Sequence, residues 1–361
     1  MVEKRSYNYG IGILRLLAMY MVVMLHITGE GGALVNAKGI GLHISNFMNI
    51  FCYCAVDCYA LLSGYVGYRE NNESYRYSKY LTLWTVVVTY SFGITLIYYL
   101  VNGDVSTTEL VRALMPVTTS QYWYFSAYTG VFFLIPWMNR FIANLSEKES
   151  NQCMIVLFAV FSVYTTISKL IGDSFVFYGG YCFAWLAILY VAGAWMKKNN
   201  IPEKLSGGKW ALIMMVLLLI SWGWKTIIPK GYGNFLFYSY LSPTVIGNAV
   251  CLIAIFSKLK VNPKFNNIIK TLGGAAFGVY IIHLHWILWT NCIRDRFIWV
   301  SAFGNLATPI VLIIATFAVF AVCMLIELIR IYVFKILGIT GIINRIQMFI
   351  DNIINKILSL V

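Results

Sequence analysis

The chain has 361 residues, of which 60% are hydrophobic and only 11% are charged, and its formal net charge is +13. A soluble domain carries about 25% charged residues, so this composition excludes an ordinary soluble enzyme and indicates an integral membrane protein. An excess of Lys and Arg would also suit nucleic-acid binding, but basic cytoplasmic loops explain it in a membrane protein, and we predict no nucleic-acid partner.

Taken in chain order, about ten segments have the length and hydrophobicity of membrane-spanning helices, since a bilayer requires about 20 apolar residues. Lys4 and Arg5 precede the first segment, but no small-residue cleavage pattern follows His26, so we interpret it as a retained helix. The predicted fold class is therefore all-α and polytopic. The expected spans are residues 9–28, 45–67, 79–101, 121–142, 152–171, 177–196, 210–228, 235–257, 272–292 and 304–334.

The last segment, residues 341–360, differs from the others. Its apolar residues repeat at helical spacing, with Arg345, Asp351 and Lys356 between them. This pattern is typical of an amphipathic helix that lies on a membrane surface. We expect a membrane domain over residues 1–337 and a C-terminal interfacial helix over residues 338–361.

The basic residues between the spans predict the orientation of the chain. Of the 27 Lys and Arg residues, Arg15 lies inside the first span and seven lie on one side, which leaves nineteen for the other. Because cytoplasmic loops are enriched in Lys and Arg, both termini are expected in the cytoplasm. The expected location of the chain is the plasma membrane. The seven are Lys38, Arg112, Lys169, Lys225, Lys230, Arg294 and Arg296.

The first span contains the stretch RLLAMYMVVMLH, with Arg15 at one end and His26 at the other. Eleven residues are three helical turns plus about 20°, so both side chains share one face, ~16 Å apart along the axis. Ionisable groups at membrane depth are costly and usually functional. The alternative is that Arg15 extends to the inner headgroups and His26 lies at the outer interface.

Two carboxylates follow Arg15 and His26 in the chain. Asp57, in the second span, could orient an imidazole or form a structural pair with a lysine, because a buried carboxylate requires a partner. Glu30 lies just past the outer end of the first helix. The second span ends in Ser63-Gly64-Tyr65, and small residues there usually permit close helix packing.

The loop after the second span is basic and carries Arg69, Arg76 and Lys79. The positive-inside rule alone explains basic residues at this position. A phosphate site on the cytoplasmic face would require the same residues, so both interpretations stay open.

The ninth span carries His283 and His285 two residues apart. On a continuous helix they point about 200° apart, so we expect at most one to face the bundle interior, with a hydrogen bond between helices as the expected role. Tyr122 and Trp123 begin the fourth span, where an aromatic belt is expected. Cysteines cluster in FCYCAVDCY (51–59), but no acidic or histidine partner has zinc-like spacing, and we predict no metal site.

Several of these motifs together resemble the membrane acyltransferase-3 family. Its signature is Arg or Lys, ten residues, then His in the first helix. Phrases similar to the other family motifs follow in order as YALLSGY (59–65), a basic pair at Arg76 and Lys79, WYFSAYTGVFFLIP (123–136) and LGGAAFGVYIIH (272–283). The resemblance runs from Arg15 to about residue 330. Lys79 replaces the usual second arginine, and Ala276 stands where serine is common.

The resemblance implies transfer of an acyl group, usually acetyl, from acyl-CoA to a hydroxyl of a surface or cell-envelope glycan or lipid-linked sugar. Acyl-CoA would be a donor substrate, and no permanently bound cofactor is expected. His26 would be the general base, with Asp57 or Glu30 fixing its tautomer. The expected donor-binding residues are Arg15, Arg69, Arg76 and Lys79, and the expected substrate-binding residues are Ser63, Tyr122, Trp123 and His283. Ser63 is also a conceivable nucleophile.

Two other function classes fit the same intramembrane residues. A transporter or flippase of a lipid-linked sugar or small solute would also place ionisable groups along an internal path, but it would not consume acyl-CoA. A sensor or partner module would only bind.

Overall fold

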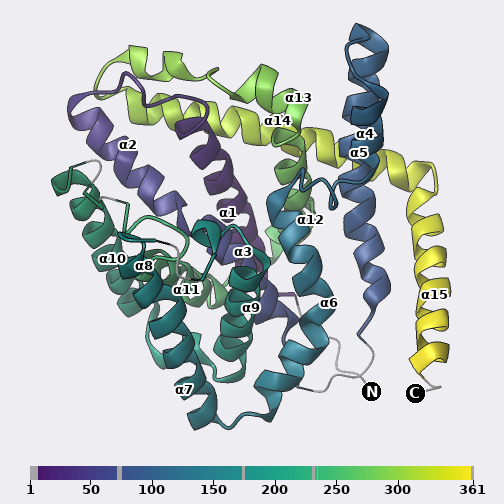
Figure 1. Ribbon diagram of the computed structural model, residues 1–361, viewed down its shortest axis with the longest axis horizontal. Coiled ribbons are helices and arrows are strands. Elements are labelled where there is room, and N and C mark those ends of the chain that lie inside the picture. Colours follow the sequence, from purple (N-terminus) through teal and green to yellow (C-terminus); the bar gives the residue numbers. More distant parts are fainter. Residues whose placement is uncertain (1–6, 71–74, 173–174, 230–231, 234, 359–361) are drawn as a thin grey trace.

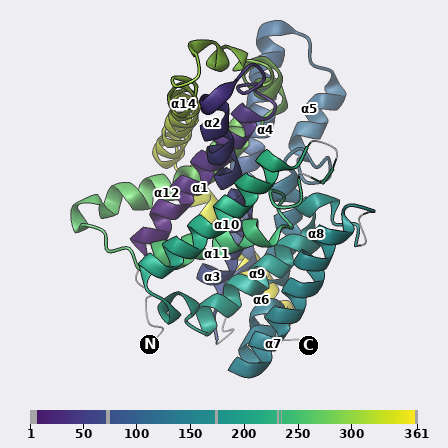
Figure 2. The same cartoon turned by 90° about the vertical axis from the view of Figure 1, so that its left-hand side faces the viewer.

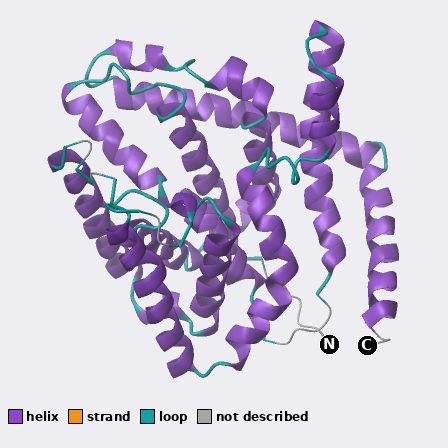
Figure 3. Cartoon of the chain, in the orientation of Figure 1, coloured by secondary structure: helices purple, strands orange, loops and turns teal. Residues whose placement is uncertain are grey.

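The computed structural model describes residues 7–70, 75–172, 175–229, 232–233 and 235–358. Every regular element among these residues is a helix and none is a strand (Figure 3). The all-α prediction is therefore confirmed. Lys4, Arg5 and Lys230, which enter the charge count, lie outside the described residues.

The first helix, α1 (Tyr9–Thr28), has the bounds that the sequence predicts. Asn8 caps its N-terminus, where the side-chain Oδ1 accepts a hydrogen bond from the Ile11 amide at 3.0 Å. An uninterrupted apolar run follows the cap. In the bundle α1 is central and packs against helices on several sides (Figures 1 and 2), among them α2 (Gly39–Cys52), α3 (Cys54–Gly67), α11 (Pro243–Ser257), α12 (Asn266–His283) and α14 (Thr308–Ile336).

The second expected span, 45–67, differs from the structure in two ways. Its helical segment begins earlier, at Gly39, and is divided at Tyr53 into α2 and α3. α4 (Tyr80–Asn102) then agrees with its predicted bounds to within one residue at each end. The short helix α5 (Thr107–Leu114), which the sequence analysis does not anticipate, begins at a capping box between Ser106 and Glu109.

The remaining helices follow the predicted order with shifted ends. The segment expected at 152–171 begins at Glu147 and includes a π-helical turn, Ala159–Tyr164, between two α-helices. The helices whose bounds have not yet been given are α6 (Trp123–Asn144), α7 (Glu147–Phe158), α8 (Thr165–Ser168), α9 (Phe183–Lys198), α10 (Gly207–Ile227), α13 (Trp286–Leu288) and α15 (Ile339–Leu358).

The helix pair α3 and α9 packs closely, and two glycines explain why. A Cβ atom on Gly64 of α3 would overlap the carbonyl of Tyr190, and one on Gly193 of α9 would overlap the carbonyl of Leu61. Small residues at facing positions let two backbones approach closely, as in other membrane helix pairs. The expectation of close packing at Ser63-Gly64-Tyr65 is therefore confirmed at Gly64.

The structure contains fewer helices suited to crossing a membrane than the sequence analysis predicts. In the described part of the chain six helical segments are long and apolar enough, and α12 with the turns after it makes a seventh if that pair, bent by 64°, is one span. α9 and α11, with 16 and 15 residues, are short for a bilayer. The chain is a multi-pass membrane protein, but the count of ten is not confirmed.

A charged cluster is buried where α14, α12 and α4 meet. The Arg330 guanidinium donates two hydrogen bonds to Glu327, at 2.6 and 2.8 Å, and the Tyr90 hydroxyl donates a third at 2.6 Å. Gly278 of α12 leaves the space that the Glu327 carboxyl occupies. Because both carboxylate oxygens of Glu327 accept hydrogen bonds and one of the donors is a guanidinium, the intramembrane charge of Glu327 is compensated structurally.

The C-terminal helix α15 lies along one edge of the molecule, beside α4 (Figure 1). Its side chains Ile342, Ile346 and Phe349 are exposed. On its protein-facing side, the Gln347 amide donates to the Thr82 hydroxyl at 2.6 Å. The predicted amphipathic helix is therefore present, whereas its place at the membrane interface and the domain boundary at residue 338 stay predictions.

Candidate functional site: two stacked cavities along the first helix

Arg15 and His26 line two different cavities, and the same three helices build both. On each of these helices, two residues four positions apart line different cavities, one the cavity at His26 and the other the cavity at Arg15. Four residues are about one helical turn, so the cavities follow one another along the helix axes. The pairs are Met19 and Arg15 on α1, Tyr59 and Ser63 on α3, and Tyr124 and Tyr128 on α6.

The cavity at His26, which we call the His26 chamber, is small and mainly aromatic. Its volume is about 60 Å³. A water molecule requires roughly 10–15 Å³ by the same kind of measure, so the chamber holds a group of only a few heavy atoms. Among its lining residues are Met19, Tyr59, Trp123, Tyr124, Tyr240 and Tyr280.

The partner of His26 is His283, which lies at the end of α12. His26 Nδ1 and His283 Nε2 are 3.0 Å apart, and His283 Nδ1 is 2.6 Å from the carbonyl oxygen of Val279. A carbonyl only accepts hydrogen bonds, so His283 Nδ1 carries the proton and its Nε2 has a lone pair. His26 Nδ1–H therefore donates to that lone pair. In neutral His26 this arrangement leaves Nε2 unprotonated and available to accept a proton.

Both histidines of the ninth expected span are buried, which contradicts the expectation that at most one faces the interior. His283 is 2% exposed and His285 is fully buried. The expectation assumes a continuous helix, but α12 ends at His283 and His285 has extended backbone angles. His285 Nε2 lies 3.0 Å from the Ser91 carbonyl and does not reach His26.

Neither carboxylate proposed to orient His26 hydrogen-bonds to it in the described structure. Asp57 is fully buried; its Oδ1 accepts a long hydrogen bond from Trp185 Nε1 at 3.4 Å, and its Oδ2 has no partner among the described residues. Glu30 is exposed in the turn after α1, where its backbone carbonyl accepts from the Asp295 amide. In this geometry His283 occupies the orienting position, and catalytic roles for Asp57 and Glu30 stay predictions.

The second cavity, which we call the cationic pocket, brings together all four basic residues expected to bind a donor. Its volume is about 330 Å³, and Arg15, Arg69, Arg76 and Lys79 line it. The Tyr59 hydroxyl donates to the Arg15 carbonyl at 2.6 Å and fixes α3 against α1 between the two cavities. Four cations around one cavity produce a positive potential suited to a polyanion. Ser63 lies here too, and its hydroxyl donates to the Tyr59 carbonyl.

One of the four cations has an acidic partner on α15. Arg76 Nε lies 2.8 Å from Asp351 Oδ2. Partial burial opposes ionisation of Asp351, but the nearby polar groups of Ser78 and the charge of Arg76 outweigh it and lower the pKa of the carboxyl. No ion pair involves Arg15, Arg69 or Lys79 among the residues that the structure describes.

An aromatic group borders the His26 chamber at the start of α6. The Trp123 and Tyr181 rings lie with centroids 4.6 Å apart, and Tyr181 and Tyr240 are 5.0 Å apart. Trp123 lines the chamber. Tyr122 is the other aromatic residue selected from the sequence; it is buried and its ring packs against Tyr280. Trp123, Tyr181 and Tyr240 form the group that we call the aromatic platform.

The sequence analysis misses the tyrosines that connect the two cavities. Tyr59, Tyr124, Tyr128 and Tyr280 line one cavity or the other, and all four lie within the phrases that resemble the family motifs, but the sequence analysis assigns none of them a role. A second signal was available. Tyr59 lies four residues before Ser63, and Tyr124 and Tyr128 are four apart, which places each pair on one helix face.

The comparisons with known proteins give one match. A family model described as an acyltransferase domain matches residues 8–328, which includes both cavities and ends before α15. The search of curated proteins and the search of solved structures find no match to the chain.

Proposed function

Because the chain belongs to the membrane acyltransferase-3 family, we propose that it transfers an acyl group from acyl-CoA to a hydroxyl of a surface or cell-envelope glycan. One observation carries this proposal. His26 lies in a small chamber, and its hydrogen bond to a second histidine leaves its Nε2 free to accept a proton. A pocket with four cations follows this chamber along the same helices. General-base chemistry and polyanion binding therefore lie within the reach of one extended molecule.

The cationic pocket suits the nucleotide end of coenzyme A. That end carries several phosphate charges, and the thioester lies at the tip of a long, thin arm. Arg15 and His26 are ~16 Å apart along α1. A donor with its phosphates against Arg15, Arg76 and Lys79 would extend its arm past Tyr59 and Tyr128 and bring its thioester to the chamber. Lys79 supplies charge without the planar fork of arginine, so it would contribute less orientation.

The His26 chamber suits the chemical step. A sugar hydroxyl is a poor nucleophile until its proton is removed. His26 Nε2 accepts this proton while the hydroxyl oxygen attacks the thioester carbonyl, and the C–S bond then breaks to release the coenzyme A thiolate. The positive charge that develops on His26 is stabilised through Nδ1–H by His283, whose own Nδ1–H remains bonded to the Val279 carbonyl.

The size of the chamber supports a short acyl group. A space of about 60 Å³ fits an acetyl group beside the imidazole and leaves no room for a long chain. The lining side chains Met19, Val22 and Phe277 limit the space on the apolar side. We therefore expect acetyl-CoA to be the preferred donor.

The aromatic platform supports a sugar acceptor. Trp123, Tyr181 and Tyr240 present ring faces and edges beside the chamber, and aromatic side chains combine apolar contact area with a polar group. With both termini in the cytoplasm, as the charge asymmetry predicts, the platform would face outward and the cationic pocket inward, so donor and acceptor would arrive from opposite sides of the plasma membrane.

The test uses purified protein in proteoliposomes supplied with acetyl-CoA labelled in the acetyl group. We expect release of free coenzyme A thiol together with label on an added cell-envelope glycan fraction. Octanoyl-CoA should be a much poorer donor. Movement of a lipid-linked sugar without consumption of thioester would instead identify a flippase and contradict the proposal.

A further inference from the structure

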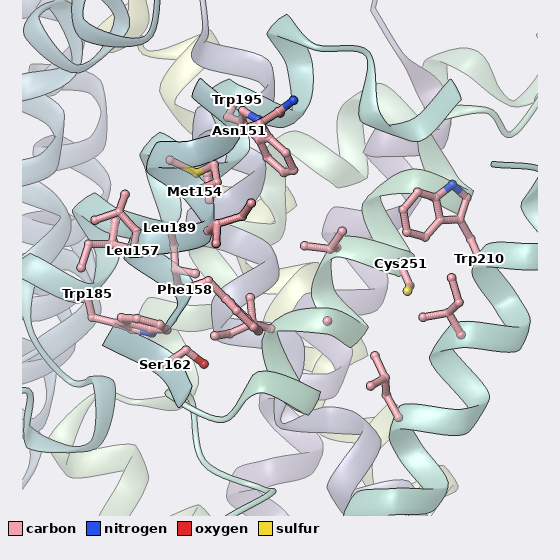
Figure 4. Close-up of a pocket in the computed structure, with 18 residues that line it drawn as sticks. Asn151, Met154, Leu157, Phe158, Ser162, Trp185, Leu189, Trp195, Trp210 and Cys251 are labelled. Carbon is pink, nitrogen blue, oxygen red and sulfur yellow. The ribbon is translucent and has the colours of Figure 1, made fainter. Parts of the chain in front are cut away.

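Two cavities of the protein differ in whether their hydrogen-bond donors are already used. A cavity of about 570 Å³ lies between α7, α9, α10 and α11 (Figure 4), and its indole N–H and serine O–H groups all donate to the protein. The acceptors are Asp57 for Trp185, Asn151 for Trp195, and the backbone carbonyls of Pro202 and Leu241 for Trp210 and Ser162. These donors are therefore not available to a bound molecule.

The His26 chamber differs, because the hydroxyl of Tyr280, which lines it, has an unused hydrogen. The hydroxyl oxygen accepts a hydrogen bond from the Tyr124 backbone amide, with 3.2 Å between nitrogen and oxygen. No acceptor for its own hydrogen lies among the residues that the structure describes. Tyr280 is only 6% exposed, so what enters the chamber must satisfy that hydrogen. The Tyr59 hydroxyl, by contrast, already donates to the Arg15 carbonyl.

The amide that bonds to Tyr280 belongs to the first turn of α6. Amides of a first turn have no acceptor within their own helix, and no side chain of the N-cap residue Tyr122 supplies one here. The Tyr280 hydroxyl, which comes from α12, fills this place. An oxygen that accepts from an amide at the positive end of a helix is polarised, and its own O–H becomes a stronger donor.

Tyr280 also lies close to the catalytic imidazole. It precedes His283 by three residues on α12, so both side chains lie on nearly the same helix face. The ring centroids of Tyr280 and His283 are 6.4 Å apart, and those of His283 and His26 are 5.1 Å apart. Because the chamber measures only about 60 Å³, a group of a few heavy atoms that contacts His26 is also within reach of Tyr280.

We propose that Tyr280 is a catalytic residue of the acyl transfer, whose O–H donates a hydrogen bond to the thioester carbonyl oxygen. The inference rests on the proposed function, which supplies the thioester. As the sugar hydroxyl oxygen attacks the carbonyl carbon, His26 Nε2 takes its proton and the π electrons of the C=O bond move onto the carbonyl oxygen.

The Tyr280 hydrogen bond strengthens as this negative charge develops, and its proton stays on the phenol. When the C=O bond re-forms, the C–S bond breaks and the coenzyme A thiolate leaves. A negative charge in a mainly aromatic chamber is costly without a donor, so the bond matters most in the transition state.

The first test is spectroscopic and requires no group transfer. The probe is acetonyl-dethia-coenzyme A, in which a methylene replaces the thioester sulfur and the ketone carbonyl carries an isotope label. Infrared difference spectra are recorded on purified protein in nanodiscs. Since a hydrogen bond lowers a carbonyl stretching frequency, the frequency should be lower in wild type than in Tyr280→Phe. A fluorotyrosine at position 280, whose hydroxyl is more acidic, should lower it further.

The second test measures acetyl transfer. Loss of one oxyanion donor costs roughly 10²–10³ in kcat, so Tyr280→Phe should lose this factor with little change in KM for acetyl-CoA. Tyr80→Phe is the matched control, because the Tyr80 hydroxyl also bonds to α6, at Thr129, but outside both cavities. It should keep the wild-type frequency and kcat.

Equal carbonyl frequencies in wild type and Tyr280→Phe would overturn the inference, and so would a fall in kcat smaller than about tenfold. The Tyr124 hydroxyl is buried without a partner among the described residues, so Tyr124→Phe is measured in parallel. If only that variant raises the frequency, Tyr124 is the donor and Tyr280 only caps α6. Failure of wild type to bind the analogue or to transfer acetyl would instead contradict the proposed function, and the catalytic role of Tyr280 would fall with it.

Discussion

The cationic pocket and the His26 chamber share three helices but differ in charge, size and lining. The pocket is about 330 Å³ and has four cations, whereas the chamber is about 60 Å³ and mainly aromatic. One helical turn separates Arg15 from Met19, Ser63 from Tyr59 and Tyr128 from Tyr124. The comparison shows how an α-helical membrane protein places a cationic pocket and a small aromatic chamber in series, since each helix changes its chemistry within four residues.

From this difference we expect the two cavities to have different roles in the reaction. Residues of the cationic pocket should determine how tightly the donor binds, and residues of the chamber should determine how fast the acyl group moves. A mutation in the first should mainly change donor affinity, and a mutation in the second should mainly change turnover.

Cysteine labelling tests which side of the membrane each cavity faces, and its expected outcome is all-or-none. Single cysteines are introduced at Lys38 and Arg112, and separately at Arg69, Lys198 and Lys264, after the exposed native Cys292 is replaced by serine. Because the charge asymmetry predicts cytoplasmic termini, an impermeant maleimide should label only the first two positions in intact cells. Labelling at Lys198 or Lys264 would reverse the assignment of donor and acceptor sides.

The largest graded effect should come from His26→Ala. Loss of a positioned general base typically costs about 10²–10⁴-fold in rate, so acyl transfer should fall by that factor while coenzyme A binding stays near wild type. Label transfer by the purified, monodisperse variant measures this. More than a tenth of the wild-type rate would remove His26 from the mechanism.

His283→Ala should have a smaller effect on the same step. It leaves His26 Nδ1–H without an acceptor, and an unmade buried hydrogen bond costs about 1–3 kcal/mol, so kcat should fall about 5- to 150-fold with little change in KM for acetyl-CoA. His283→Gln keeps an acceptor oxygen and should recover part of the rate.

His285→Ala is the matched control for His283→Ala. His285 is equally buried and two residues away, but it bonds to the Ser91 carbonyl instead of His26. Its loss should lower stability and leave kcat of the folded protein near wild type. Equal losses of kcat in both alanine variants would show that His283 acts only through packing.

The smallest effect concerns Asp351, which competes with the donor for Arg76. An exposed ion pair contributes about 0.2–1 kcal/mol, so Asp351→Asn should tighten coenzyme A binding by about fivefold or less. Glu147→Gln, which breaks an ion pair with Lys204 away from the pocket, should change nothing. The gain should disappear as the pH falls through the pKa of Asp351, because the protonated wild-type residue then resembles asparagine. Weaker binding in Asp351→Asn would contradict this role.

Some of this architecture was predictable because it depends on local sequence. The bounds of α1 follow from one cap residue and an unbroken apolar run, and the basic residues of the cationic pocket lie close to each other or to α1 in the chain. The break at Tyr53 and the burial of His285 were not predictable in this way, because the periodic rule assumes that a helix continues.

The contact that defines the chamber also could not be predicted from local sequence patterns. His26 and His283 are 257 residues apart and meet only because α12 packs against α1. The sequence gives no information on which of the polar intramembrane residues becomes the partner of His26. The sequence analysis offered Asp57 and Glu30 as alternatives, but the packing of α3 directs Asp57 toward Trp185.

The separation of donor binding from proton removal is tested most directly by titrating coenzyme A into Arg15→Ala, Arg15→Lys and His26→Ala by calorimetry. Loss of a charge-assisted hydrogen bond costs roughly 1.5–3 kcal/mol, so Arg15→Ala should bind about one to two decades more weakly. Arg15→Lys should recover part of that affinity, since the charge survives without the fork. His26→Ala should bind like wild type. If Arg15→Ala binds coenzyme A as tightly as wild type, or His26→Ala binds as weakly as Arg15→Ala, the two cavities do not divide the work in this way.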